Sequence, residues 1–272
     1  MNTRYLLLPL ALILIIACQP QPNQQAEEEV TTPEWQSLFN GEDLNGWIPK
    51  IRNYELNDNF ENTFSVQDGA MTVGYDGYGP FNTRYGHIFY EQPYSHYHFR
   101  MQYRFFGEQA EEGEGWAYRN SGIMVHCQSP ESMLKDQDFP ISIEVQLLGG
   151  AEEGDRPTAN LCTPGTHVHM ADTLLTDHCL PSASQTYRGD QWVNVYVEVY
   201  GDSLIRHIVE GDTVLSYTLP QIGGGVVNGF DPKMKPDGEL LRSGYISLQS
   251  ESHPVQFRNI EILDLSDQFS GK

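Results

Sequence analysis

The feature that most constrains this fold is a strict alternation of side chains in two neighbouring segments, residues 120–128 and 141–148. Successive side chains of a β-strand point to opposite faces, so a period of two predicts a strand with one buried face. The side chains expected on the inner faces are Ser121, Ile123, Val125, Cys127, Ile141, Ile143, Val145 and Leu147. Those expected on the outer faces include Asn120, His126, Glu144 and Gln146. If the two strands are neighbours, an amide, an imidazole, a carboxylate and a second amide line one surface.

The same alternation recurs along the chain. Residues 98–105, 192–200 and 244–265 predict further strands. Residues 64–73 and 204–219 predict hairpins, because Asp-Gly and Glu-Gly-Asp turns interrupt their alternating patterns. No amphipathic helical pattern of convincing length follows the first 32 residues. Many short strands separated by turn residues indicate an all-β protein, either a β-sandwich or a jelly roll.

Two stretches interrupt this regularity. Residues 149–191 are rich in Gly, Pro, Thr and His, and they exceed the usual length of structureless loops in compact domains. Their length alone makes them a candidate functional segment. Residues 223–238 are also rich in Gly and Pro but contain few reactive groups, so we expect an ordered surface loop there.

The charge balance restricts the class of partner. The chain has 16 Lys and Arg residues against 37 Asp and Glu residues, a formal net charge of -21. Such a surface repels phosphate groups, which argues against nucleic acid and acidic lipid as partners and favours a neutral ligand. A hydrophobic content of 39% is sufficient for a sizeable core, so the protein is expected to be globular.

The amino terminus resembles a bacterial lipoprotein leader. Arg4 precedes an apolar run, residues 6–17, that is shorter than the roughly 20 residues needed to span a bilayer. Cys18 ends this run and is the expected lipidation site. We therefore expect a signal peptide at 1–18, a flexible tether at 19–32 and a single domain at 33–272. The resemblance implies export and a lipid anchor as the only membrane contact, and Gln19 after the cysteine favours the outer membrane.

The remaining cysteines divide into two kinds. Cys127 falls on the inner face of its strand, where a free cysteine packs as a small hydrophobe. Cys162 and Cys179 flank a loop, and an exported protein permits a disulfide between them. The alternative is a zinc site that adds His residues 167, 169 and 178 to this pair. The spacing matches no standard zinc finger, so the disulfide is favoured.

Several motifs, in order, resemble the 3-keto-disaccharide hydrolase domain family. Each is weak alone, but their order and spacing cover residues 35–265, nearly the whole mature chain. The motifs are residues 38–47 (LFNGEDLNGW), 120–122 (NSG), 144–146 (EVQ), 246–249 (ISLQ) and 257–260 (FRNI). The resemblance implies a concanavalin-like jelly roll of two curved antiparallel sheets with a ligand cleft. It also implies cleavage of 3-keto-glycosides or 3-keto-disaccharides, whose oxidised sugar a partner sugar 3-oxidoreductase would supply.

The chemistry of such a substrate suits the polar residues in these motifs. A carbonyl at C3 acidifies the proton on C2, so one base can start an elimination that water addition completes as net hydrolysis. Glu144 and His126 are the candidates for base and acid. Asn120, Gln146 and Gln249 are candidate donors or sugar-hydroxyl binders, and Arg258 is a candidate positive charge near the enolate. Glu144 and His126 alone do not define a metal site; no metal ligand is assigned, although a divalent cation is compatible with the chemistry.

Ordinary structural roles explain each of these residues as well. A glutamate on an outer strand face is most often solvated, and a histidine beside a core cysteine is often a packing residue. Two other function classes also remain open. A carbohydrate-binding envelope lipoprotein would bind sugar without forming product. A structural envelope protein would do neither.

Overall fold

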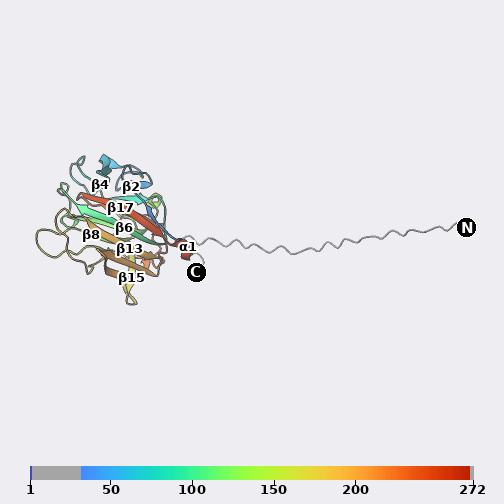
Figure 1. The fold of residues 1–272 in the computed structure, drawn as a ribbon. Coiled ribbons are helices and arrows are strands. Elements are labelled where there is room, and N and C mark those ends of the chain that lie inside the picture. Colours follow the sequence, from blue (N-terminus) through green and yellow to red (C-terminus); the bar gives the residue numbers. More distant parts are fainter. Residues whose placement is uncertain (2–31, 270–272) are drawn as a thin grey trace. The chain divides into compact units, whose positions relative to one another are not determined.

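The computed structural model describes Met1 and residues 32–269. From Pro33 onward the chain forms a compact unit built almost entirely of antiparallel strands (Figure 1). The expected lipidation site Cys18 and residues 19–31 of the expected tether lie outside the described residues. No described helix is long and apolar enough to cross a bilayer.

The larger sheet has ten strands in the order β11-β10-β15-β14-β13-β6-β17-β4-β3, and β1 pairs with β17 beside this path. Its strands are β1 (Trp35–Ser37), β3 (Phe64–Gln67), β4 (Ala70–Val73), β6 (His96–Phe105), β10 (Thr166–Met170), β11 (Thr173–Leu175), β13 (Val193–Tyr200), β14 (Leu204–Val209), β15 (Asp212–Ile222) and β17 (Val255–Asp264).

The smaller sheet has seven strands in the order β12-β9-β8-β7-β16-β5-β2. Its strands are β2 (Trp47–Ile51), β5 (Gly86–Tyr90), β7 (Asn120–Cys127), β8 (Ile143–Leu148), β9 (Asn160–Cys162), β12 (Cys179–Leu180) and β16 (Tyr245–Ser250). The described helices are all short: η1 (Phe60–Asn62), η2 (Gly115–Ala117), η3 (Pro130–Ser132), η4 (Pro232–Met234) and α1 (Ser266–Phe269). The all-β sandwich expected from the sequence is confirmed.

Both predicted hairpins form with two-residue turns. Asp68 and Gly69 connect β3 to β4 with φ angles of 52° and 74°. Glu210 and Gly211 connect β14 to β15 with φ angles of 49° and 93°. Positive φ at both central residues matches the right-handed twist of the flanking strands, which is why Asp-Gly and related pairs favour this turn.

One core fills the space between the two sheets. The inward residues of β7 and β8 meet those of β13 and β6, as the alternation predicts. Buried members from these strands are Ile123, Val125, Ile143, Val145, Leu147, Val193, Val195, Val197, Val199, Phe99, Met101 and Tyr103. Complete burial of one such aliphatic or aromatic side chain contributes roughly 1.5–3 kcal/mol, so this core fixes which faces point outward.

A bulge near the end of β7 overturns two predicted orientations. Cys127 pairs with Tyr245 and Met124 with Ser247, so three residue steps on β7 match two on β16. His126 has φ 52°, and the extra residue reverses the alternation after it. Cys127 therefore packs beside Met124 in a separate small cluster instead of on the inner face. The expectation that His126 lies on the outer face with Glu144 is likewise wrong.

The long segment 149–191 is not structureless. Strands β9 and β12 extend the seven-stranded sheet beyond β8, and β10 and β11 extend the ten-stranded sheet beyond β15. Cys162 of β9 and Cys179 of β12 are register partners and form a disulfide, as expected. The segment thus builds one wall next to Glu144, since Glu144 pairs with Cys162 across β8 and β9.

Candidate active-site cleft

A cleft of about 340 Å³ opens on the outer face of the seven-stranded sheet. Strands β7, β8 and β16 supply a polar base, and loops from distant parts of the sequence supply apolar sides. The lining residues are Trp116, Asn120, Phe139, Glu144, Gln146, Cys162, Pro164, His178, Cys179, Val226 and Glu251. We call the polar base, together with the adjoining Gln249, the floor: Asn120, Glu144, Gln146, Gln249 and Glu251. We call Trp116, Phe139, Pro164, Val226 and the disulfide the rim.

Sheet register explains why the floor residues converge. β7 and β8 are antiparallel neighbours, with Met124 opposite Glu144 and Gly122 opposite Gln146. The expectation that the two strands are adjacent is therefore confirmed. Gln249 lies on β16, the other neighbour of β7, and Glu251 follows that strand directly.

The lack of a side chain at Gly122 leaves room for the side chain of Glu144. A Cβ atom at this position would lie 2.8 Å from Glu144 Oε1 and 2.9 Å from its Cγ. Ordinary contacts of a Cβ atom begin at about 3.4 Å, so any larger residue here would collide with the carboxyl group. The glycine of the Asn-Ser-Gly motif thus lets Glu144 fold back over β7.

The two floor carboxyl groups are buried and interact. Glu144 is 6% exposed and Glu251 is 3% exposed. Burial raises the pKa of Glu144 from 4.5 to about 8. Burial, then the neighbouring charges of Glu144 and Glu114, raise the pKa of Glu251 well above its ordinary value, and Arg156 opposes this only partly. Like charges in a dry site cannot both ionise easily, so the pair retains a proton at neutral pH.

Several floor atoms have no protein hydrogen-bond partner although they are buried. They are Asn120 Oδ1, Glu251 Oε2 and both amide atoms of Gln249. Native structures leave few such atoms unpaired, because an unmade buried hydrogen bond costs about 1–3 kcal/mol. Asn120 and Glu251 line the cleft, and Gln249 adjoins it on the strand beside β7, so these unpaired acceptors and this donor are suited to a hydroxyl- and carbonyl-bearing ligand.

A buried basic pair adjoins the floor on the side of β5 and β2. His87 is the register partner of both Gln249 and Lys50. Lys50 is 2% exposed, and its Nζ donates to the carbonyls of Ile51 and Lys135 at 3.1 and 3.0 Å. Burial lowers the pKa of Lys50 to about 8 and, with the nearby ammonium, lowers the pKa of His87 to about 3. His87 is therefore a neutral imidazole at physiological pH.

Sequence reasoning missed Glu251, His87 and Lys50. The signal for Glu251 was present, because Ser247, Gln249 and Glu251 alternate with the core residues Ile246 and Leu248. Nothing local distinguishes Lys50, since only the pairing of β2 with β5 places it beside His87.

Two of the expected site residues lie elsewhere. The His126 ring is buried, and its Nε2 lies 3.0 Å from the carbonyl oxygen of Gly201, in the turn between β13 and β14 of the other sheet. Burial lowers the pKa of His126 to about 4. The bulge turns this side chain away from Glu144, so the structure does not support it as the catalytic partner.

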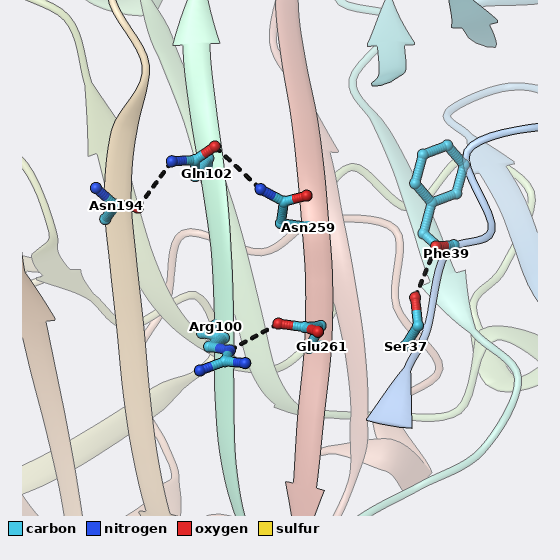
Figure 2. Close-up of polar contacts among 7 residues, drawn as sticks. All are labelled: Ser37, Phe39, Arg100, Gln102, Asn194, Asn259 and Glu261. Carbon is cyan, nitrogen blue, oxygen red and sulfur yellow. Dashed lines mark hydrogen bonds and ion pairs between the residues drawn. The ribbon is translucent and has the colours of Figure 1, made fainter. Parts of the chain in front are cut away.

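Arg258 lies on the outer face of the ten-stranded sheet. Its Nε donates to Gln102 Oε1 at 2.7 Å, and its guanidinium lies 4.0 Å from the ring centre of Trp192. Figure 2 shows Gln102 between Asn194 and Asn259 in this exposed row of side chains. The Arg258 side chain is therefore on the opposite face of the sandwich from the cleft and supplies no charge to it.

The structure does not assemble the alternative zinc site that the sequence left open. Within residues 32–269, one group of three His, Cys, Asp or Glu residues has its potential ligand atoms within 4.8 Å of one another. It consists of Cys162, His178 and Cys179. The two sulfurs form a disulfide and are not thiolates, and His167 and His169 lie on β10 in the other sheet. On the floor, the oxygens of Glu144, Glu251, Asn120 and Gln249 are the donor type that a hard divalent cation prefers.

Solved structures of other proteins are similar to this one. A crystal structure of a provisionally named glycosyl hydrolase from Parabacteroides distasonis has 18% identity and a TM-score of 0.51, covering 85% of this chain and 100% of its own. A second such protein from the same organism has 20% identity and a TM-score of 0.49, covering 85% and 94%. A carbohydrate binding module from Bacillus subtilis has 9% identity and a TM-score of 0.44, covering 81% and 97%.

Sequence comparison gives the family. None of the curated proteins matches this sequence significantly. A family model described as the 3-keto-alpha-glucoside-1,2-lyase-like domain matches residues 34–263, which confirms the resemblance inferred from the motifs. Because that match covers most of the chain, the protein belongs to the 3-keto-alpha-glucoside-1,2-lyase-like domain family.

Proposed function

We propose that this protein cleaves glycosides whose sugar carries a carbonyl at C3, by elimination across C1 and C2 followed by hydration. The observation that carries the proposal is the pair of buried carboxyl groups, Glu144 and Glu251, in a cleft with unpartnered amide groups. Membership in a family named for glycoside cleavage supports the same class of substrate.

Glu144 is the proposed base. Its pKa of about 8 makes it a much stronger proton acceptor than an ordinary carboxylate, and the C3 carbonyl acidifies the proton on C2. The carboxylate takes this proton, and the electron pair of the C2–H bond forms an enolate toward the C3 oxygen. Gln249 Nε2, which is buried and unpartnered, is the proposed donor to that oxygen.

Glu251 is the proposed acid. The C3 carbonyl re-forms as the C1–C2 double bond develops, and the bond from C1 to the aglycone oxygen breaks. Glu251 holds a proton at neutral pH because its pKa is raised, and it transfers this proton to the leaving oxygen. Water then adds across the double bond: its hydroxyl goes to C1, its proton returns to Glu251, and Glu144 returns a proton to C2.

The other floor groups position the sugar. Asn120 Oδ1 is a free acceptor for a sugar hydroxyl. Gln146 Oε1 already accepts from Asn160 Nδ2 at 3.1 Å, so this amide is held in place and can present its other groups to a ligand. The proposed reaction differs from that of ordinary glycosidases, which use two carboxyl groups on unoxidised sugars, because it begins with removal of the C2 proton.

The test compares oxidised and unoxidised substrates. The purified protein is incubated with a 3-keto-glucoside and with its parent glucoside, and products are followed by mass spectrometry in deuterated water. We expect cleavage of the keto substrate alone, with deuterium incorporated at C2 of the sugar product. Cleavage of the parent at a similar rate would refute the elimination route in favour of ordinary glycosidase chemistry.

Variants then test the two roles. Glu144→Gln and Glu251→Gln are each expected to lower kcat/KM by at least about 100-fold, since general acid–base groups contribute 10²–10⁴-fold. Glu198→Gln is a matched control, because Glu198 pairs with Arg206 on the larger sheet, away from the cleft. Full activity in both cleft variants would remove these residues from the mechanism.

The proposal also covers the source of the substrate and the location of the protein in the cell. The substrate must be made by an oxidoreductase that converts the C3 hydroxyl of a glycoside to a carbonyl. We propose that the protein meets this product after export, anchored through Cys18. Metabolic labelling with a fatty acid, compared between the native chain and Cys18→Ser, tests the anchor directly.

A further inference from the structure

Two exposed apolar side chains stand at the mouth of the cleft. Trp116 is 53% exposed and Val226 is 49% exposed, and both line the cavity. They come from η2 and from the glycine-rich segment after β15, which lie far apart in sequence. Exposed large apolar groups gathered at a concave site indicate binding of an apolar surface.

Both groups are held in place. Val226 has φ 56°, a conformation that is strained for a β-branched residue and that persists only where the surroundings impose it. The carbonyl of the preceding Gly225 accepts a hydrogen bond from Gly165 N at 2.8 Å. On the other side, Arg156 Nη2 donates to the carbonyl of Trp116 at 3.1 Å, which ties η2 to the cleft wall. The apolar mouth is therefore preorganised.

The rim and the floor offer a ligand opposite chemistries. The floor presents carboxyl and amide groups, whereas Trp116, Phe139, Pro164, Val226 and the disulfide present almost no hydrogen-bonding side-chain group. His178 is the one polar side chain among the lining residues outside the floor. A ligand that fits both parts is a sugar joined to an apolar group.

We infer that the rim selects 3-keto-glycosides with an aromatic, apolar aglycone over those whose aglycone is a second sugar. The inference rests on the proposed function. A second sugar ring would bring several hydroxyl groups to the rim, and those that leave water would find almost no protein partner there. A phenyl ring would instead exchange water for contact with Trp116 and Val226, which aromatic stacking and apolar burial both favour.

The test measures selectivity as a ratio of kcat/KM values. A 3-keto-glucoside of phenol and a 3-keto-glucosyl-glucose disaccharide of the same anomeric configuration are compared. We expect the phenyl substrate to be favoured at least about tenfold, within the range that an apolar pocket supplies. Equal or better cleavage of the disaccharide would overturn the inference.

Two rim variants test whether Trp116 and Val226 cause the selectivity. Trp116→Ala and Val226→Gly are each expected to lower kcat/KM for the phenyl substrate about 10-fold or more and to change that for the disaccharide less than about threefold. Glycine at 226 also relieves the strained backbone, so loss of folding is not expected. Leu219→Gly is the matched control, because Leu219 is 39% exposed with φ 47° but does not line the cleft. An unchanged ratio in both rim variants would refute the assignment.

A binding experiment separates this inference from the proposed reaction. Phenyl glucosides and maltose, neither of them oxidised, are titrated into the protein by isothermal titration calorimetry. Tighter binding of phenyl glucoside than of maltose, lost in Trp116→Ala, supports the rim even if no keto substrate is cleaved. Binding of maltose as tight as that of phenyl glucoside refutes it whether or not cleavage occurs.

Discussion

The substitution Gly122→Ala tests the central geometry of the cleft with a single methyl group. Gly122 does not have a positive φ, so alanine is compatible with its backbone. The added Cβ would lie 2.9 Å from Glu144 Cγ, whereas ordinary contacts begin at about 3.4 Å, so the two atoms must separate by about 0.5 Å. Because Met124 Sδ also lies 3.1 Å from the new atom, β7 offers no open space toward that side.

The expected result is a loss of activity without a loss of folding. A misplacement of about 1 Å in a catalytic group costs about 100-fold, so a shift of half this size is expected to lower kcat/KM about 10- to 100-fold. Stability is expected to stay within about 1 kcal/mol of the native value, because replacing glycine in a strand reduces unfolded-state entropy and offsets the crowding.

The assay pairs steady-state kinetics on a 3-keto-glucoside with urea unfolding. Gly74→Ala is the control, since its Cβ would meet no atom within 4 Å and its φ is not positive. A native value of kcat/KM in Gly122→Ala would refute the claim that the position of Glu144 requires glycine at residue 122. A large loss of stability with proportionate inactivity would show instead that the position serves packing.

Three further predictions follow from other parts of the molecule. The raised pKa of Glu144 means that the folded protein binds a proton more tightly than the unfolded chain between about pH 4.5 and 8, so the free energy of unfolding should fall as pH rises through this window. The fall should be less steep in Glu144→Gln, where burial still raises the pKa of Glu251, and kcat/KM of the native protein should rise toward pH 8. Replacing both Cys162 and Cys179 by Ser opens a loop with a sequence separation of 17 and should lower the free energy of unfolding by about 3 kcal/mol, measured in urea. His126→Ala should lower it by about 2 kcal/mol through the lost bond to Gly201 while leaving kcat/KM within about twofold, and a 100-fold loss of activity in a folded variant would restore a catalytic role.

The sequence by itself determined the elements and most of their facing. Alternating residues in 141–148 and 192–200 placed their apolar side chains in the core, and the Asp68-Gly69 turn closed its hairpin as expected. The same period of two put Glu144 and Gln146 on the face that became the floor. These features follow from local rules, because strand geometry and turn conformation depend on neighbouring residues alone.

The bulge at His126 could not be foreseen from the local pattern. The alternation around it reads as one continuous strand, and only pairing with β16 shows that β7 has one residue too many. A single extra residue reverses every later side chain, which moved both Cys127 and His126 from their expected faces. Arg258 was misplaced for a different reason, since sequence order does not say to which of the two sheets the last strand belongs.

Only the tertiary structure decided which groups meet in the cleft. Glu251 and Glu144 are far apart in sequence, and both of their pKa values are raised because β16 and β8 flank the same strand and exclude water from both carboxyl groups. Trp116 and Val226 likewise reach one mouth from separate loops. Strand pairing between distant segments depends on the global packing of two sheets, so the sequence specified the reactive groups, whereas the fold specified their partners.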